Sequence, residues 1–310
     1  MRFIVTLLSL MLLCTMSRAM SPQTVVYDIA GSDTLRLDFY RAESKHPTPL
    51  MIFAFGGGFK GGSRDEQAFM PMFEYMTRNG VSVASVDYRT LLGKVNPSEM
   101  MSAEGFKSHL IAAIDTAVTD FARATAYLDN HALQFNIDTK QIFACGSSAG
   151  AITVLQAEYV LANHPGAFSV YGLAPEFNYA GVISMAGAIC SDGALRFNSA
   201  PCPLLMFHGD ADAIVPFVKA ELDGFGLWGS KTVSDTLAAE DIPHRFHRVN
   251  GASHEVSGTP MRRYCGEMYD FIRAVCDGEA GETVLTEESV PGKTDYKTDF
   301  TVLDYIKANL

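Results

Sequence analysis

The chain has 310 residues, of which 48% are hydrophobic, and a formal net charge of -11 at pH 7. This length and composition can bury one large core, so we expect a single main domain. The acidic balance leaves no Lys/Arg cluster to displace counterions from phosphates, which argues against nucleic acid as a partner.

The first 19 residues have the pattern of a signal peptide. Met1-Arg2 is followed by the largely apolar run Phe3 to Met16 and then by Ser17-Arg18-Ala19. A charge, an apolar stretch and a small residue, in this order, precede a signal cleavage site. A membrane anchor is the alternative, but the run is shorter than the roughly 20 apolar residues that span a bilayer. We predict cleavage after Ala19 and a secreted or periplasmic chain without stable membrane insertion.

Export would leave an odd number of cysteines: Cys145, Cys190, Cys202, Cys265 and Cys276. At least one of them must then be a free thiol or form an intermolecular bond. Cys190 and Cys202 flank a polar loop, where a disulfide would contribute roughly 3 kcal/mol in the chain-entropy model; the sequence leaves this pairing open. No Cys-x-x-Cys or His-x-x-x-His spacing indicates a metal site, and we expect no cofactor.

Hydrophobic periodicity predicts alternating strands and helices. Residues 34–40 alternate apolar and charged side chains, as in a half-exposed strand near a sheet edge. Shorter, mostly apolar runs, typical of a parallel sheet covered on both faces, predict further strands at residues 50–55, 81–86, 141–145, 181–185 and 204–207. Residues 245–249 are interpreted as one more strand. Helical spacing is found at residues 66–79, 113–132 and 148–163. This alternation is typical of a doubly wound α/β fold.

The chain becomes polar after residue 276. Gly278, Gly281, Pro291 and Gly292 interrupt regular patterns, so we expect a surface tail over residues 277–298. Apolar residues from Phe300 to Ile306 then predict a short helix that docks on the domain. We accordingly divide the mature chain into a catalytic domain, residues 20–278, and a polar tail, residues 279–310.

The first motif with chemical content is Phe55-Gly56-Gly57-Gly58-Phe59, directly after a predicted strand. Three consecutive glycines allow the backbone to turn several N–H groups toward one point, and such donors stabilise an oxyanion. A plain flexible turn or a phosphate loop is the alternative. A phosphate loop would end in Gly-Lys-Ser/Thr, which is absent here.

The second motif is Gly146-Ser147-Ser148-Ala149-Gly150, which follows the strand 141–145 and opens the helix 148–163. A sharp turn that lifts a serine hydroxyl out of a sheet brings neighbouring backbones too close for side chains, which explains both glycines. We predict Ser148, and not Ser147, as a nucleophile. The N–H of Ala149 lies at the helix start, where it favours developing negative charge.

With these two motifs the chain resembles the α/β-hydrolase superfamily, and in particular carboxylesterases of the hormone-sensitive-lipase-like and acetyl or feruloyl esterase-like branch. The resemblance includes Asp87-Tyr88-Arg89 and Asn136-Ile137-Asp138 and extends over residues 30–276. It implies a mostly parallel central sheet with helices on both faces, and an oxyanion hole formed by Gly57, Gly58 and Ala149. In that family the glycine loop usually begins with His. Here it begins with Phe55, so the resemblance does not imply what supports the loop or shapes the acyl pocket.

The family order of nucleophile, acid and histidine places both partners after Ser148. The segment from His208 to Pro216 resembles the acid-bearing segment of related hydrolases, which implies Asp212 as the acid, with Asp210 as the competitor in the same loop. His254 lies in a loop just beyond the strand 245–249, where catalytic groups converge in open α/β folds. We therefore predict a triad of Ser148, Asp212 and His254.

The resemblance implies a secreted serine carboxylesterase that hydrolyses short-chain or carbohydrate-linked esters through an acyl-enzyme. A serine peptidase of the same fold and a catalytically silent binding protein are the alternatives. The expected partner is a small-molecule or polysaccharide-linked ester. Acyl and alcohol specificity and oligomeric state are not readable from the sequence.

Overall fold

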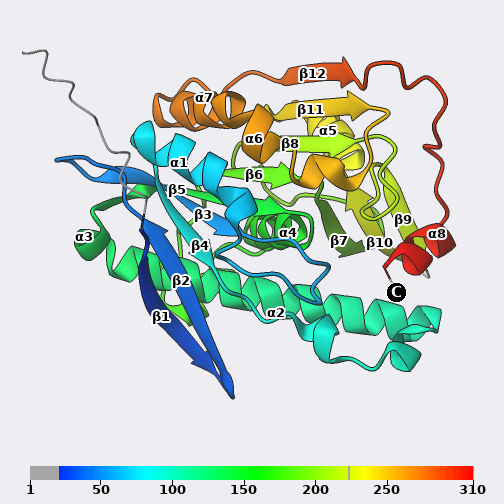
Figure 1. Ribbon diagram of the computed structural model, residues 1–310, viewed down its shortest axis with the longest axis horizontal. Coiled ribbons are helices and arrows are strands. Elements are labelled where there is room, and N and C mark those ends of the chain that lie inside the picture. Colours follow the sequence, from blue (N-terminus) through cyan, green and yellow to red (C-terminus); the bar gives the residue numbers. More distant parts are fainter. Residues whose placement is uncertain (1–20, 223, 310) are drawn as a thin grey trace, which may run out of the picture.

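The computed structural model describes residues 21–222 and 224–309, so the predicted signal peptide lies outside the described residues. A nine-stranded sheet crosses the molecule in the order β1-β2-β4-β3-β5-β6-β8-β11-β12 (Figure 1). Its strands are β1 (Gln23–Ala30), β2 (Asp33–Tyr40), β3 (Thr48–Ala54), β4 (Ser82–Val86), β5 (Ile137–Ser147), β6 (Gly181–Met185), β8 (Leu204–Gly209), β11 (Arg245–Asn250) and β12 (Val284–Ser289). β1 and β2 run antiparallel to their neighbours, and the strands from β4 to β12 are parallel.

The predicted strands are confirmed within a few residues at their ends, since each apolar run lies in the sheet interior. Every residue of β4 and β6 is buried, as expected for strands covered on both faces. β1 was not predicted. It forms a hairpin with β2 and is the outer strand at this side of the sheet.

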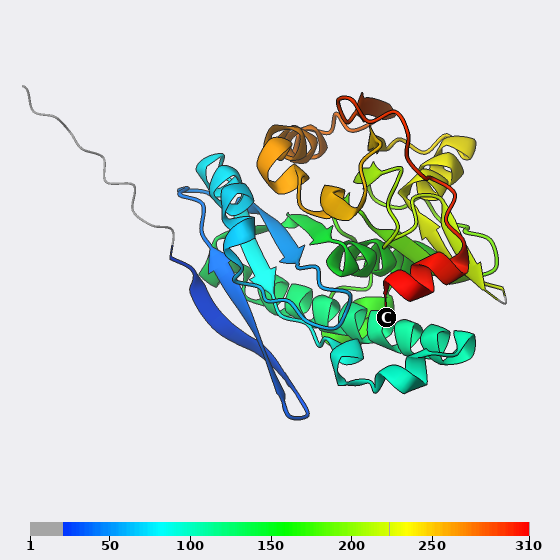
Figure 2. The same ribbon diagram turned by 45° about the vertical axis from the view of Figure 1, so that its right-hand side comes forward.

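Helices cover both faces of the sheet, which confirms the doubly wound arrangement. α1 (Met70–Arg78) and α7 (Cys265–Cys276) contact each other on one face, and α2 (Ala103–Asn130) and α4 (Ala149–Asn163) contact each other on the other (Figure 2). The remaining helices are α3 (Ala132–Phe135), α5 (Ser230–Ala239), α6 (Pro260–Arg263) and α8 (Val302–Ala308). The predicted helix 113–132 begins earlier than expected, because Ser102 caps it by accepting a hydrogen bond from the N–H of Gly105.

A second, three-stranded antiparallel sheet was not predicted. It has the order β7-β10-β9, with β7 (Ala188–Asp192), β10 (Phe225–Gly229) and β9 (Lys219–Leu222). β7 begins shortly after β6 ends, so this small sheet extends the molecule beyond the carboxyl ends of the main strands.

The expectation of a surface tail over residues 277–298 is wrong for its central part. Residues 284–289 form β12, which pairs in parallel with β11 from Val284 opposite Arg245 to Ser289 opposite Asn250. An edge strand with one neighbour and an exposed flank tolerates a polar sequence, so the strand lacks the apolar run that identified the others. The predicted docking helix is confirmed as α8.

The five cysteines that the structure describes are all unpaired, so the Cys190–Cys202 disulfide, which the sequence left open, is not formed. Within residues 21–222 and 224–309, no helix combines the length and apolarity needed to cross a membrane.

Candidate active site

The turn that carries Ser148 joins β5 to α4 in a conformation that side chains rarely adopt. Ser148 has φ 52° and ψ -117°, and its N–H donates to the carbonyl oxygen of Met185 at 2.9 Å. A Cβ at Gly146 would lie 2.2 Å from the Gly150 oxygen, and one at Gly150 would lie 2.1 Å from the Ala54 oxygen. Both glycines are therefore required by the close approach of backbone, as the motif predicts.

The structure brings the three predicted triad side chains together. The Oγ of Ser148 lies 2.8 Å from Nε2 of His254, and Nδ1 of His254 lies 2.8 Å from Oδ2 of Asp212. Ser148 comes from the end of β5, Asp212 follows β8, and His254 follows β11. Parallel strands place these carboxyl ends at one edge of the sheet, which explains how residues more than 100 positions apart meet.

Asp212 is fully buried and held by hydrogen bonds on both oxygens. Oδ1 accepts from the N–H groups of Ile214 at 2.8 Å and Val215 at 3.0 Å, while Oδ2 also lies 3.4 Å from Nε2 of His208. Burial by itself raises the pKa of Asp212, but the hydrogen bonds from His208 and His254 outweigh it and hold the pKa well below its usual range. The ionised carboxylate only accepts, so Nδ1 of His254 carries the proton and Nε2 is free to accept from Ser148.

Asp210, the competing acid, has a different set of partners. It accepts from the N–H of Gly251 at 2.7 Å and from Arg248 at 2.9 Å, and Tyr296 lies 3.4 Å away. These hydrogen bonds connect the loop that contains Asp210 and Asp212 to β11 and to the segment after β12. The geometry thus favours Asp212 as the acid and gives Asp210 a structural role.

Other polar side chains near the triad form hydrogen bonds with partners of their own. The hydroxyl of Ser147 donates to the Ser257 carbonyl at 2.8 Å, which links the nucleophile turn to the His254 loop. His208 is buried, with Nδ1 2.8 Å from the Ser230 hydroxyl and Nε2 3.4 Å from Asp212. His247 lies 2.8 Å from Glu267. Among the described residues, no cluster of three or more His, Cys, Asp or Glu side chains has the arrangement of a metal site.

The glycine loop lies against the nucleophile turn. A Cβ at Gly56 would lie 3.2 Å from Cβ of Ser148. Gly57 and Gly58 have φ of 126° and 62°, in the region that favours glycine, and the N–H of neither donates to another described residue. The N–H of Ala149, the first residue of α4, has no acceptor within its helix. Gly58, Ala149 and Ser148 line one cavity, whereas Gly57 lines the adjoining cleft.

An aromatic pair supports this loop where the family usually has His. The rings of Phe55 and Tyr88 stack at 4.4 Å, and the buried Tyr88 hydroxyl donates to the Phe55 carbonyl oxygen at 2.7 Å. A Cβ at Gly62 would lie 2.7 Å from the Phe55 ring, so the loop folds closely over it. The start of the glycine loop is therefore fixed by stacking and by one buried hydrogen bond.

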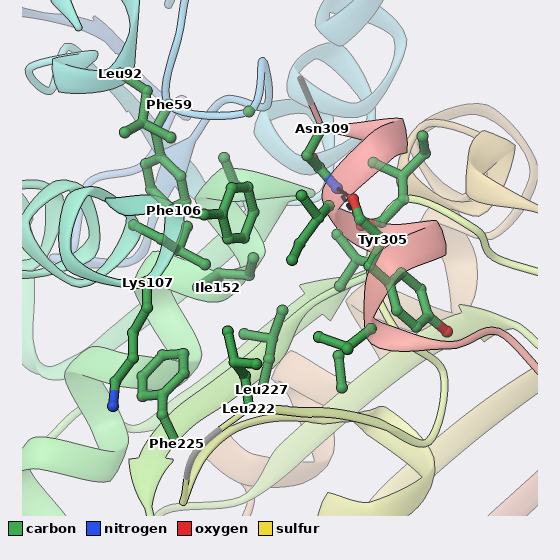
Figure 3. A pocket seen from close by; sticks show the side chains of 18 of the residues that line it. Phe59, Leu92, Phe106, Lys107, Ile152, Leu222, Phe225, Leu227, Tyr305 and Asn309 are labelled. Atoms are coloured by element: carbon green, nitrogen blue, oxygen red, sulfur yellow. Dashed lines mark hydrogen bonds between the residues drawn. The ribbon is translucent and has the colours of Figure 1, made fainter. Parts of the chain in front are cut away.

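Two spaces lie beside the triad, one lined by Ser148 and the other by Ser147 and Glu255. The first is a narrow cavity of about 70 Å³ with mostly apolar walls (Figure 3), formed by Gly58, Phe59, Leu92, Phe106, Lys107, Leu110, Ser148, Ala149, Ile152, Ile214, Val215, Ala220, Leu222, Phe225, Leu227, Val302, Tyr305, Ile306 and Asn309. The second is a wider cleft of about 660 Å³ between the glycine loop and the His254 loop, with polar residues that include Glu66, Glu255, Thr259 and Arg262. Sequence reasoning missed the contributions of α8 and of the small sheet to the first space.

Comparisons with known proteins agree with this fold. The BD-FAE family model matches residues 37–189. The curated protein "Putative esterase NocK" from Nocardia uniformis subsp. tsuyamanensis is 30% identical over 139 residues, which cover 44% of this chain and 36% of that protein. The chain thus spans about a third of the length of this relative.

Solved structures of an esterase from Thermogutta terrifontis, Est2, are similar over most of the chain. The propionate-bound form is 19% identical with a TM-score of 0.57, covering 85% of this chain and 97% of that one. The form phosphorylated by paraoxon is 18% identical with a TM-score of 0.56, covering 85% and 96%. The chain has the α/β-hydrolase fold, as the sequence predicted.

Proposed function

We propose that this α/β-hydrolase-fold chain is a secreted serine carboxylesterase that cleaves short-chain or carbohydrate-linked esters through Ser148, His254 and Asp212. The observation that carries the proposal is the continuous chain of hydrogen bonds from the Ser148 hydroxyl through His254 to a buried carboxylate, with Ser148 in the wall of an apolar cavity. The BD-FAE match and the named esterases among the similar proteins support the same reaction class.

In the proposed reaction, Nε2 of His254 takes the hydroxyl proton as Oγ of Ser148 attacks the ester carbonyl carbon. The carbonyl π bond opens to an oxyanion, which the N–H groups of Ala149, Gly58 and Gly57 would stabilise. His254 then gives its proton to the departing alkoxide and an acyl-enzyme remains. His254 then takes a proton from water as the water oxygen attacks the acyl carbon and forms a second oxyanion. As this oxyanion collapses, the bond to Oγ breaks, His254 returns the proton to Oγ of Ser148, and the acid leaves.

The two spaces give the ester an orientation. The acyl group lies in the narrow cavity, since its walls are apolar and offer burial to hydrocarbon. The alcohol must leave on the side of His254, because that imidazole protonates it. Glu255, the residue after His254, lines the wider cleft. Carboxylate, hydroxyl and guanidinium groups in this cleft suit a hydroxyl-rich alcohol, which supports a carbohydrate-linked ester. Release of acetate from acetylated xylan tests this substrate, and no release at any pH counts against it.

Export is proposed from the amino-terminal sequence. Sequencing of the protein recovered from a culture medium or periplasmic fraction should give a first residue of Met20. Recovery of the chain only in the cytoplasm, with Met1 retained, would refute it.

The test of the activity compares residues 20–310 with the Ser148→Ala variant on p-nitrophenyl acetate, butyrate and octanoate. We expect turnover that disappears in the variant while its thermal melt stays unchanged. A matched control is Ser44→Ala, which removes an exposed hydroxyl that bonds only to His46 and should leave the activity unchanged. A folded wild-type protein no more active than Ser148→Ala would instead favour the peptidase or binding alternatives.

A further inference from the structure

Helix α8 forms one wall of the acyl cavity, although it lies more than 150 residues after Ser148 in the sequence. Figure 3 shows Tyr305 and Asn309 of α8 on one side of the cavity, facing Phe59 and Phe106 on the other. Ile306 lines the same wall and is 8% exposed, whereas Leu303, on the same helix, is 60% exposed and does not line the cavity. The helix therefore has a distinct cavity side.

Two segments near the proposed catalytic residues bind the carboxyl end of α8: the residues after Asp212 and the residues after the glycine loop. The side-chain amide of Asn309 donates to the Ile214 carbonyl at 2.9 Å, two residues after Asp212. The ammonium of Lys60, which follows the glycine loop, donates to the Asn309 carbonyl oxygen. At the other end, Thr301 and Asp304 form a capping box that fixes the start of the helix. The wall is thus anchored at the carboxyl end of α8, and the amino end of the helix is capped.

The cavity that α8 closes is small. Its volume of about 70 Å³ is less than half of the roughly 150 Å³ of an engineered cavity that binds benzene. Packed interiors resist the insertion of extra carbon atoms, because neighbouring side chains must leave their rotamers or the backbone must shift. A longer acyl chain therefore meets the α8 wall before it is fully buried.

We propose that α8 sets the upper limit of acyl length, with Ile306 as the limiting side chain, and that the preferred substrates are esters of short acyl groups. This inference rests on the proposed esterase function, because it assigns the cavity to the acyl group. Its basis is the position of Ile306 in the wall, the anchoring of α8 and the size of the cavity.

The test measures kcat/KM for p-nitrophenyl acetate, butyrate, hexanoate and octanoate. Ile306→Ala removes three carbon atoms from the wall, so the octanoate-to-acetate ratio should rise at least about tenfold over wild type. Leu303→Ala removes as many carbon atoms from the exposed side and should leave the ratio unchanged. Ile306→Phe fills the cavity further and should lower the butyrate-to-acetate ratio. Equal loss on all esters in Ile306→Ala, or an equal rise in Leu303→Ala, would overturn the role of α8.

A second measurement separates this inference from the proposed function. Equilibrium binding of p-nitrophenyl octanoate is compared between Ser148→Ala and Ser148→Ala/Ile306→Ala, neither of which needs to turn over the ester. We expect about tenfold tighter binding in the double variant. Unchanged binding overturns the inference even if the wild type is an active esterase, whereas an inactive wild type with tighter binding in the double variant overturns only the proposed reaction.

Discussion

Replacement of Asp212 by Asn tests the assignment of the acid most directly. The carboxylate is fully buried and accepts from Nδ1 of His254 at 2.8 Å, so it selects the tautomer in which Nε2 is free to accept the Ser148 proton. In Asp212→Asn, the side-chain oxygen can still accept from the N–H groups of Ile214 and Val215, but the amide NH₂ then faces His254. A donor at this position selects the opposite tautomer, which leaves Nε2 protonated.

The expected magnitude follows from this reversal. Loss of the correct tautomer without loss of geometry lowers kcat by about 10,000-fold in enzymes with the same triad. At 1.36 kcal/mol for each factor of ten, this is about 5 kcal/mol of transition-state stabilisation. The measurement is kcat/KM for p-nitrophenyl acetate, together with the thermal melt of each variant.

Asp210→Asn is the matched control, because it makes the same chemical change in the same loop. Asp210 is 2% exposed and pairs with Arg248 and the N–H of Gly251. Its replacement should lower the free energy of unfolding by about 1–3 kcal/mol and change kcat/KM by less than tenfold. A folded Asp210→Asn variant that loses more activity than Asp212→Asn would refute the assignment.

Two further predictions concern the packing of the nucleophile turn and a buried carboxyl. Gly150→Ala should lower the free energy of unfolding by more than about 3 kcal/mol in urea titrations, because the new Cβ would lie 2.1 Å from the Ala54 oxygen. Gly281→Ala is the control and should change this free energy little, because its new Cβ would have no atom within 4 Å. Equal effects of the two substitutions would contradict the steric argument. Burial raises the pKa of Glu158 from 4.5 to about 7, so the wild type should lose stability between these two pH values as the unfolded chain ionises first. Glu158→Gln should remove this loss of stability. Its free energy of unfolding should exceed that of the wild type by up to about 3 kcal/mol at pH 8, and should not exceed it at pH 4. A difference in unfolding free energy that does not change with pH would contradict the reasoning.

Most of the sheet could be predicted because buried parallel strands have a local signature. The runs in β3, β4, β6 and β8 are apolar since both of their faces are covered. The strand–serine–helix context of Ser148 is equally local. Asp212 was predicted as the acid from the resemblance of a longer segment. Its hydrogen bond to His254 distinguishes it from Asp210, since both residues suit a turn after the same strand.

The strands that were not predicted have no such local signature. β12 has polar residues at an edge, where one ladder of hydrogen bonds suffices, and the strands of the small sheet are short. The cavity wall is set by contacts between residues as far apart as Lys60 and Asn309, which no periodicity encodes. The apolar residues after Phe300 did predict a helix. They could not indicate which part of the molecule it would contact.

The position of α8 has a consequence for how the protein is made. Ribosomes add residues from the amino end, so a growing chain contains Ser148, Asp212 and His254 before it contains α8. If α8 limits acyl length as proposed, the residues that set this limit are the last of the site to be synthesised. A purification tag fused beyond Asn309 would begin beside the cavity, whereas β1 and α8 lie on opposite sides of the molecule (Figure 1). A tag ahead of β1 would therefore begin away from α8 and the cavity.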